Sequence, residues 1–465
     1  MMKKTFLILL AAVLAFGAVS CAGNVPGGDS TSGNTAGDTA GNTAGETADD
    51  TTGDTSGDTT SETSDTPSDG ENDPLALCIT EAMTLTGTAA DIRARYKDYA
   101  EMGFTAVRID GGFSMKTAEK CTLTDYFVTQ LREAERVGLT VKLIIPTVMT
   151  VPTYVKDDPG MYFYDEQGRQ GVNSVSYFWD GLLSYTENAL RQELKALKRS
   201  GYMSVVGGLV VDFGAAGEPI YPAQWTQGRS ENDCLWWFGE AAERSFRDAM
   251  EKKYGDYAAL SSARGKKISS FDAVRPPKRG EGKGQWFADA IEWYYQVKRD
   301  FIEAQIGVYK KVTAEYGLSV PLVLYMPGTE ATEADKKQAA ETADPGSGVC
   351  LAADNGFMVD MAVKYGCVLQ YTGANDIARL SGIVGYMEKK GCADIPVYAE
   401  NAGDPGSAKM FLGSEEELFS LGLAGLDFTN ASHIYVGDEK DAFRSELEKS
   451  MKKWTEYVGS RNSLR

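Results

Sequence analysis

Two glutamates, Glu218 and Glu400, stand in short segments whose composition suits a catalytic carboxylate. Glu218 belongs to VVDFGAAGEPIYPAQW, where the small residues 214–217 let the backbone turn tightly and let a substrate approach closely. Glu400 belongs to VYAENAGDPGS, where polar and small residues follow the acid. A single glutamate in a loop is most often only solvated, so the prediction depends on the two residues being brought together.

A pair of carboxyl groups is the equipment needed to cleave a glycosidic bond. One carboxylic acid delivers a proton to the leaving oxygen, while a second, ionised carboxylate attacks the sugar or activates water. Tyr221 and Trp225 follow Glu218 closely and offer flat rings suited to sugar faces. We therefore predict that Glu218 and Glu400 are catalytic and that Tyr221 and Trp225 bind substrate.

Histidine and cysteine usage narrows the alternative chemistries. His433 is the only histidine, which argues against a histidine-rich zinc site and leaves a Ser-His-Asp hydrolase dependent on one residue. The sequence has no Gly-rich phosphate loop and no EF-hand-like loop, so we predict no cofactor and assign no metal ligand, while calcium binding stays open. The six cysteines beyond Cys21 include no CxxC pair, and both buried thiols and disulfides stay open for them.

Eight short apolar runs alternate with amphipathic helical stretches and must position these acids. Such alternation indicates a parallel sheet, and eight repeats predict an α/β fold, a (β/α)8 TIM barrel with loop insertions. The expected strands are 76–83, 104–110, 139–147, 205–214, 320–326, 367–372, 395–400 and 424–429. Helices are expected at ADIRARYKDYAEMG and SYTENALRQELKALKRSGY, and a later helical region carries Trp236, Trp237, Trp286 and Trp293.

Catalytic groups in such barrels lie where strands end and the following loops begin. The two glutamates follow the fourth and end the seventh expected strand, so barrel closure would aim both into one mouth. Asp110 ends the second expected strand, and we predict that it binds a sugar hydroxyl rather than caps a helix. Asp212 is expected to be structural, whereas Glu81 and Asp427 stay open between rim contacts and buried ion pairs.

At these residues the chain resembles the glycoside hydrolases of family 14, the β-amylases. GAAGEPIYP (214–222) is similar to that family's acid motif, G-P-A-G-E-[hydrophobic]-R-Y-P, and AENA (399–402) is similar to its G-E-N-A segment. LQYT (369–372), VRID (107–110) and VPTYVKDDPGMYFYDEQG (151–168) are similar to further family segments, in the same order. The order and spacing hold over most of residues 76–435.

The resemblance implies an inverting hydrolysis of an α-1,4-glucan. Glu218 would be the general acid and Glu400 the general base. Thr372 and Asn401 would help to position water and the second carboxylate, and Asp110 would hold a glucose hydroxyl.

Some residues that shape starch binding in the β-amylases are missing. The flexible loop after strand 3, H-Q-C-G-G-N-V-G-D, is absent, and an Arg of the acid motif is Ile220 here. A Lys of strand 5 corresponds to Tyr325, and an Arg near strand 8 to Thr429. The two-carboxylate chemistry is retained, but starch itself is put in question, because loss of a polar contact changes which sugar is accepted.

Two alternatives keep the same barrel. The chain also resembles the family 42 β-galactosidases, in PTYVKDDPGMYFYDEQGR and in the placement of the two glutamates after strands 4 and 7. That alternative makes Glu400 a nucleophile in a retaining reaction. A hypothesis from a different class is a non-catalytic, glycan-binding surface lipoprotein.

The first 73 residues predict export and attachment to a membrane. Two lysines precede an apolar run too short to span a bilayer, and small residues precede Cys21. We predict a lipoprotein signal peptide over 1–21 with a lipid on Cys21, the alternative being an ordinary signal peptide with an incidental cysteine. Residues 22–73, rich in Thr, Gly, Asp and Ser, carry twelve acids and no Lys or Arg, which predicts a disordered linker. The domain over 74–465 would then be held at the bacterial cell surface or membrane.

Charge argues against nucleic acid as a partner. The whole chain has a formal net charge of -19, and residues 74–465 retain 54 acidic and 45 basic residues. A mildly acidic surface does not suit phosphates, which require a basic face. The expected partner is a poly- or oligosaccharide.

Overall fold

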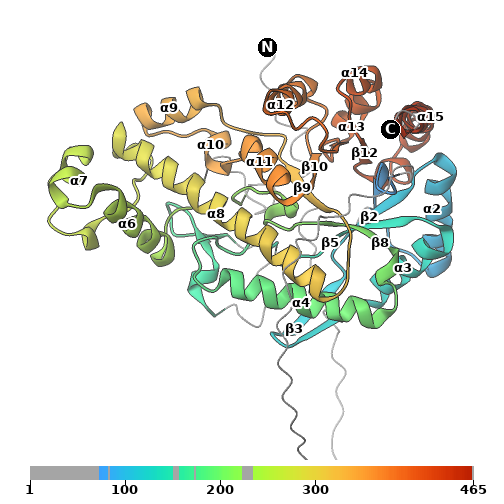
Figure 1. The fold of residues 1–465 in the computed structure, drawn as a ribbon, viewed down its shortest axis with the longest axis horizontal. Helices are drawn as coiled ribbons and strands as arrows, with labels where there is room; N and C mark the ends of the chain where they lie inside the picture. Colours follow the sequence, from blue (N-terminus) through green and yellow to red (C-terminus); the bar gives the residue numbers. More distant parts are fainter. Residues whose placement is uncertain (1–72, 82–83, 150–156, 172–173, 223–233, 463–465) are drawn as a thin grey trace, which may run out of the picture.

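Eight parallel strands close into a barrel in the order β1-β12-β11-β10-β9-β8-β5-β2. Figure 1 shows this barrel with helices around it. The computed structural model describes residues 73–81, 84–149, 157–171, 174–222 and 234–462. The barrel strands are β1 (Leu77–Thr80), β2 (Ala106–Asp110), β5 (Thr140–Ile144), β8 (Val206–Val210), β9 (Leu322–Met326), β10 (Val368–Tyr371), β11 (Val397–Glu400) and β12 (Gly425–Phe428). Each lies inside one of the eight runs expected from the sequence, so the predicted barrel is confirmed.

Helices surround the barrel and join its strands. They are α2 (Ala89–Met102), α3 (Asp125–Val137), α4 (Leu182–Ser200), α6 (Glu240–Tyr254), α7 (Tyr257–Arg264), α8 (Gln285–Glu315), α9 (Glu333–Thr342), α10 (Ser347–Leu351), α11 (Asn355–Tyr365), α12 (Ile377–Lys390), α13 (Pro405–Leu412), α14 (Glu415–Ser420) and α15 (Lys440–Asn462). Two short antiparallel pairs, β3 (Phe113–Thr117) with β4 (Lys120–Leu123) and β6 (Phe163–Tyr164) with β7 (Gln170–Gly171), extend from loops. Among the helices described, none is long and apolar enough to cross a membrane.

Local sequence explains where α2 and α3 begin and end. Thr88 and Thr124 cap the first turns of α2 and α3 with their hydroxyl groups. Gly103 and Gly138 end the same helices with φ of 101° and 85°, a left-handed conformation that suits glycine. The strands β2 and β5 begin within three residues of these turns.

A long excursion separates β8 from its barrel helix α8. Figure 1 shows α6 and α7 at one end of the molecule, beside α8 and away from the strands. The expected helical region is wrong at Trp236 and Trp237, which lie before α6 outside any helix. Their indole N–H groups donate to the loop carbonyls of Pro222 and Pro277, so tertiary contacts decide the backbone there.

The inside of the barrel is apolar at one end and polar at the other. Leu75, Cys78, Ala106, Val323 and other apolar residues form a small buried cluster between the strands. Further along the strands, alternate positions carry the polar residues Thr80, Arg108, Lys142, Gln370 and Asp427, all buried. Because alternate strand residues face the same side, the polar residues of β1, β2, β5, β10 and β12 can meet inside the barrel.

Candidate functional site

Glu218 lies in a tight loop after β8. A single 3-10 turn over Ala215–Gly217 precedes it, with φ of 56° at Ala216 and 80° at Gly217. The Gly217 N–H donates to the Gly214 carbonyl at 2.9 Å, which closes the turn. The small residues therefore form the sharp turn expected of them.

The surroundings of Glu218 favour its protonated form. The side chain is partly buried, and burial raises the pKa of Glu218 to about 7. The hydroxyl of Thr372 donates to Glu218 Oε1 at 2.5 Å and lowers the pKa somewhat, while the negative charge of Glu400 raises it again. A carboxyl poised near neutral pH is suited to deliver a proton.

Glu400 has surroundings of the opposite kind. It is the last residue of β11 and is only 5% exposed. Arg108 Nη1 lies 2.8 Å from Oε1, the hydroxyl of Thr429 donates to Oε1 at 2.8 Å, and the Gln370 amide donates to Oε2 at 2.5 Å. A guanidinium and two neutral donors complement a negative charge on this carboxylate and fix its orientation.

Strand β10 brings the two carboxyls together. Gln370, which holds Glu400, and Thr372, which holds Glu218, are two residues apart. Alternate residues of a strand face the same side and are separated by roughly 6.6 Å along it. The two glutamates therefore share the barrel mouth, as the sequence predicted.

A network of buried charges lies under the pair. Lys142 Nζ is 2.6 Å from Asp427 Oδ2, and Arg108 Nη1 is 3.4 Å from the same oxygen. Burial favours the neutral acid, but Lys142 and then Arg108 outweigh it and lower the pKa of Asp427 to about 2. Gln370 also donates to Asp427 at 3.1 Å, so the network continues directly to Glu400.

Arg108, Lys142 and Gln370 were not predicted as site residues. Arg108 lies in VRID and Gln370 in LQYT, segments that drew notice for Asp110 and Thr372. They could have been found because each is a charged or amide side chain inside an apolar run that predicts a buried strand, and a buried polar group needs a bonding partner.

Asp110 ends β2 at the barrel mouth. Its Oδ1 is 3.2 Å from Arg108 Nε, and its side chain is 23% exposed. Burial raises the pKa of Asp110, and Arg108 opposes that shift. The residue is thus placed beside the contacts of Glu400, and its role toward a sugar stays a prediction.

Thr372 and Asn401 act differently from expectation. Thr372 bonds to Glu218 and not to the second carboxylate. Asn401 Oδ1 accepts from the Thr429 N–H at 2.9 Å, and its amide donates to the carbonyls of Thr429 and Ala402. The Asn401 side chain therefore supports the Glu400 carboxylate through Thr429, whose hydroxyl makes the direct contact.

Tyr221 is not a sugar-stacking residue in this structure. Its side chain is fully buried, its ring stacks on Tyr294 with centroids 3.7 Å apart, and its hydroxyl donates to the Tyr294 carbonyl. The prediction for Tyr221 is wrong because the ring anchors the acid loop to α8. The predictions for Trp225 and Cys21 fall outside the described residues.

The remaining acids near the strand ends are structural. Glu81 is buried in an ion pair with Arg95 at 2.6 Å, which decides between its two alternatives. Asp427 is likewise a buried ion-pair partner. Asp212 accepts from the main-chain N–H groups of Val148 and Met149, so it fixes a loop, as expected of a structural acid.

Cysteine, histidine and acid side chains show no metal site in the described ranges. No group of three or more potential ligands is found there. His433 stacks on Phe443 with ring centroids 5.3 Å apart. Cys78, Cys121, Cys367 and Cys392 are buried free thiols.

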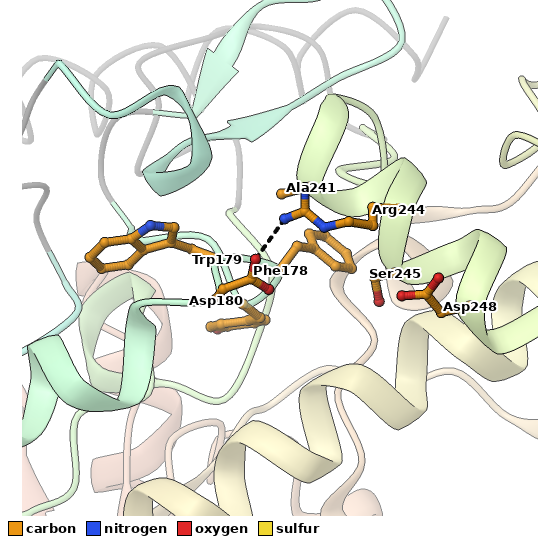
Figure 2. Close-up of a pocket in the computed structure, with 8 residues that line it drawn as sticks. Phe178, Trp179, Asp180, Ala241, Arg244, Ser245 and Asp248 are labelled. Carbon is orange, nitrogen blue, oxygen red and sulfur yellow. Dashed lines mark hydrogen bonds and ion pairs between the residues drawn. The ribbon is translucent and has the colours of Figure 1, made fainter. Parts of the chain in front are cut away.

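A surface pocket lies apart from the carboxyl pair. It has a volume of about 270 Å³ and is lined by the segment 177–180 and by α6 (Figure 2). Figure 2 shows Arg244 reaching across to Asp180, with Ser245 and Asp248 further along α6. None of the predicted site residues lines it, so the barrel mouth, with its charges and perturbed carboxyl, is the better candidate for chemistry.

Comparison with known proteins confirms the resemblance to β-amylases. The chain is 30% identical over 174 residues to the thermophilic β-amylase of Thermoanaerobacterium thermosulfurigenes, covering 35% of this chain and 30% of that protein. The match therefore spans less than a third of that relative's length. No family model matches the chain.

Solved structures share the fold. The catalytic domain of the Paenibacillus polymyxa β-amylase superposes with a TM-score of 0.66 at 16% identity, covering 82% of this chain and 99% of that domain. The β-galactosidase of Marinomonas ef1 gives a TM-score of 0.54 at 16% identity, covering 82% of this chain and 59% of that one. Both resemblances found in the sequence, the stronger to β-amylases and the weaker to β-galactosidases, are thus present in the fold.

Proposed function

We propose that the domain over 74–465 is a glycoside hydrolase in which Glu218 is the general acid and Glu400 the ionised partner. The observation that carries the proposal is the contrast between the two carboxyls. Glu218 is partly buried with a raised pKa, whereas Glu400 contacts a guanidinium and two neutral donors. A carboxyl that favours its proton and a carboxylate held by a guanidinium, both in one mouth, can divide the roles that glycosidic cleavage requires.

The proposed reaction uses these contacts. The Glu218 proton passes to the glycosidic oxygen as the bond to the anomeric carbon breaks, so the leaving sugar departs as an alcohol. Arg108, Gln370 and Thr429 hold Glu400 in the same mouth, and in this reaction it would face the carbon that becomes electron-deficient. In an inverting reaction Glu400 takes a proton from attacking water, and in a retaining reaction it first bonds to the sugar.

An α-1,4-glucan cleaved with inversion is the first choice of substrate and outcome. The similarity to β-amylases supports it. The second candidate is a retaining, β-galactosidase-like reaction at the same two glutamates, supported by the similarity of fold to β-galactosidases. Asp110, at the rim beside Arg108, is proposed to hold a sugar hydroxyl in either case.

We also propose that the enzyme is exported and held at the bacterial membrane by a lipid on Cys21. The support is the sequence alone: a short apolar run after two lysines, small residues before Cys21, and an acidic linker over 22–73. Such a placement suits an enzyme that meets polysaccharides outside the cell.

The test is hydrolysis of a glycan panel, starch and galactosides included, by the 74–465 domain. Glu218→Gln and Glu400→Gln should each lower kcat by at least about a hundredfold while the circular dichroism spectrum is unchanged. Glu388→Gln, an exposed acid on α12, is the matched control and should retain full activity. Binding of glucan without release of reducing sugar would instead establish the glycan-binding alternative.

Proton NMR of the first-formed sugar anomer then separates the two candidates. Inversion of the anomeric configuration supports the β-amylase-like reaction, and retention supports the β-galactosidase-like one. An active Glu218→Gln variant would remove that residue from the mechanism.

A further inference from the structure

A row of polar side chains on α8 bonds to main-chain carbonyls of neighbouring segments, one of which is the loop that carries Glu218. The row consists of Tyr294, Lys298, Gln305 and Tyr309, all fully buried. Their spacing of four, seven and four residues places them on one face of the helix. Each donates a hydrogen bond to a main-chain carbonyl, and the acceptors are Cys350, Pro219, Asp212 and Ile145.

Lys298 makes the contact closest to the acid. Its ammonium donates to the Pro219 carbonyl at 2.7 Å and to the Ala352 carbonyl. Pro219 directly follows Glu218, so the bonded carbonyl belongs to the peptide group between Pro219 and Ile220, one residue beyond the acid. Burial lowers the pKa of Lys298 to about 7, although the carboxylate of Asp354 opposes the shift. A fully buried amine destabilises a fold unless its hydrogen bonds compensate, so these two carbonyls matter.

The second carbonyl belongs to a turn that packs against the acid loop. The Tyr221 N–H donates to the Leu351 carbonyl at 3.1 Å, and Ile220 packs on Leu351 and Ala353. Lys298 thus bonds to both of two adjacent segments, 218–221 and 351–353. Without its amine, two buried carbonyls would lack these bonds and the segments could move relative to α8.

We propose that Lys298 is a positioning residue that holds the Pro219 carbonyl, one residue beyond Glu218, so that the Glu218 carboxyl meets both Thr372 and the leaving oxygen. The inference rests on the proposed function and adds a residue that contacts neither the substrate nor the second carboxylate. Loss of the bond should displace the acid and leave Glu400 in place, because Glu400 is held by β2, β10 and the segment after β12.

The test exploits the dependence of acid catalysis on the leaving group. Phenyl glycosides need protonation of the leaving oxygen, whereas 2,4-dinitrophenyl glycosides leave with little help. We expect Lys298→Met to lower kcat/KM, which reports the step in which the leaving group departs, on phenyl glycosides of glucose, maltose or galactose by about tenfold or more, and on the dinitrophenyl glycosides by less than about threefold. Equal losses on both classes, or no loss, would overturn the proposal.

A control separates positioning from general loss of stability. Leu447→Ala, in the buried face of α15 outside the barrel, should lower the Tm without favouring either class of leaving group. If Lys298→Met does not fold, Lys298→Gln, which is shorter and uncharged, is compared in the same way.

Hydrogen exchange gives a readout that needs no activity. We expect the peptide over 213–222 to exchange at least about tenfold faster in Lys298→Met, while Leu447→Ala leaves it protected. Unchanged exchange there would show that Lys298 does not hold the loop. A wild-type domain that is inactive on every glycoside would overturn the proposed function and, with it, the role of Lys298 in catalysis. Hydrogen exchange would still show whether Lys298 holds the loop over 213–222.

Discussion

The proton on Glu218 is governed by a few named contacts. Burial and the nearby charge of Glu400 raise its pKa, and the Thr372 hydroxyl and Arg108 lower it, with a net value of about 7. A general acid works only while protonated. Activity should therefore be retained on the acidic side of neutrality and fall as the pH rises through 7.

Substitution of Thr372 tests this balance. Thr372→Val removes the hydroxyl that stabilises the ionised carboxylate, so the pKa of Glu218 should rise and the alkaline limb of kcat/KM should move to higher pH, by about half a unit or more. The measurement is the pH profile of the wild type and the variant on one substrate. Thr313→Val, whose hydroxyl bonds within α8, is the matched control and should leave the limb in place. A limb that moves to lower pH in Thr372→Val would contradict the assignment of Glu218 as the acid.

At the scale of single elements, α4 carries a buried acid, Glu193. Glu193 is 1% exposed, and its Oε2 has no hydrogen-bond partner in the described part of the chain. Burial raises the pKa of Glu193 well above its usual range, and the charge of Asp212 adds to the effect. The folded protein therefore keeps a proton that the unfolded chain releases above a pH of about 4.3.

This linkage has a definite sign. The contribution of Glu193 is fully present below the unfolded pKa and is lost as the pH rises toward the folded one. Glu193→Gln removes the titration, so at pH 8 it should stabilise the domain by at least about 1 kcal/mol, with little gain at pH 4. Thermal unfolding followed by circular dichroism at the two pH values measures the difference. Equal effects at both pH values would count against a neutral buried carboxyl.

The elements themselves were largely predictable, and their contacts were not. The eight strands and the helices α2 and α4 follow from apolar periodicity, because each has to bury one face or both. Trp236 and Trp237 were misassigned because periodicity cannot register indole N–H groups that bond to distant loop carbonyls. Glu218 and Glu400 were found from local composition and their places after strands.

The side chains that bond to these glutamates could not be predicted from the sequence. Arg108 and Gln370 are remote from Glu400 in sequence, and only barrel closure brings them to it. Tyr221 had the composition of a sugar platform, yet its ring packs on Tyr294 of α8. The direction in which a loop side chain points depends on residues far away in the sequence, so it cannot be predicted from the loop residues alone.

At the scale of the whole molecule, charge is distributed unevenly. Residues 22–73 carry twelve of the 66 acids, and no Lys or Arg lies among them. If a lipid on Cys21 holds the protein at a membrane, as proposed above, this acidic segment is what joins the lipid to the barrel domain.

The proposed anchor predicts a change of location. Cys21→Ser should abolish incorporation of labelled fatty acid and move the protein from the membrane fraction to the soluble fraction, because the apolar run alone is too short to span a bilayer. Cys234→Ser, a substitution in the barrel domain, is the control and should leave the location unchanged. Retention of Cys21→Ser in the membrane fraction would rule out a lipid on Cys21 as the anchor.

The central claim is that Glu218 and Glu400 act on one bond in one mouth, and a double-mutant cycle tests it most directly. We would measure kcat for the wild type, Glu218→Gln, Glu400→Gln and the double variant on the best substrate of the panel. Residues that act as a unit are strongly non-additive, so the double variant should be about as slow as the poorer single variant. Losses that multiply, or a single variant that keeps most of its activity, would contradict the account.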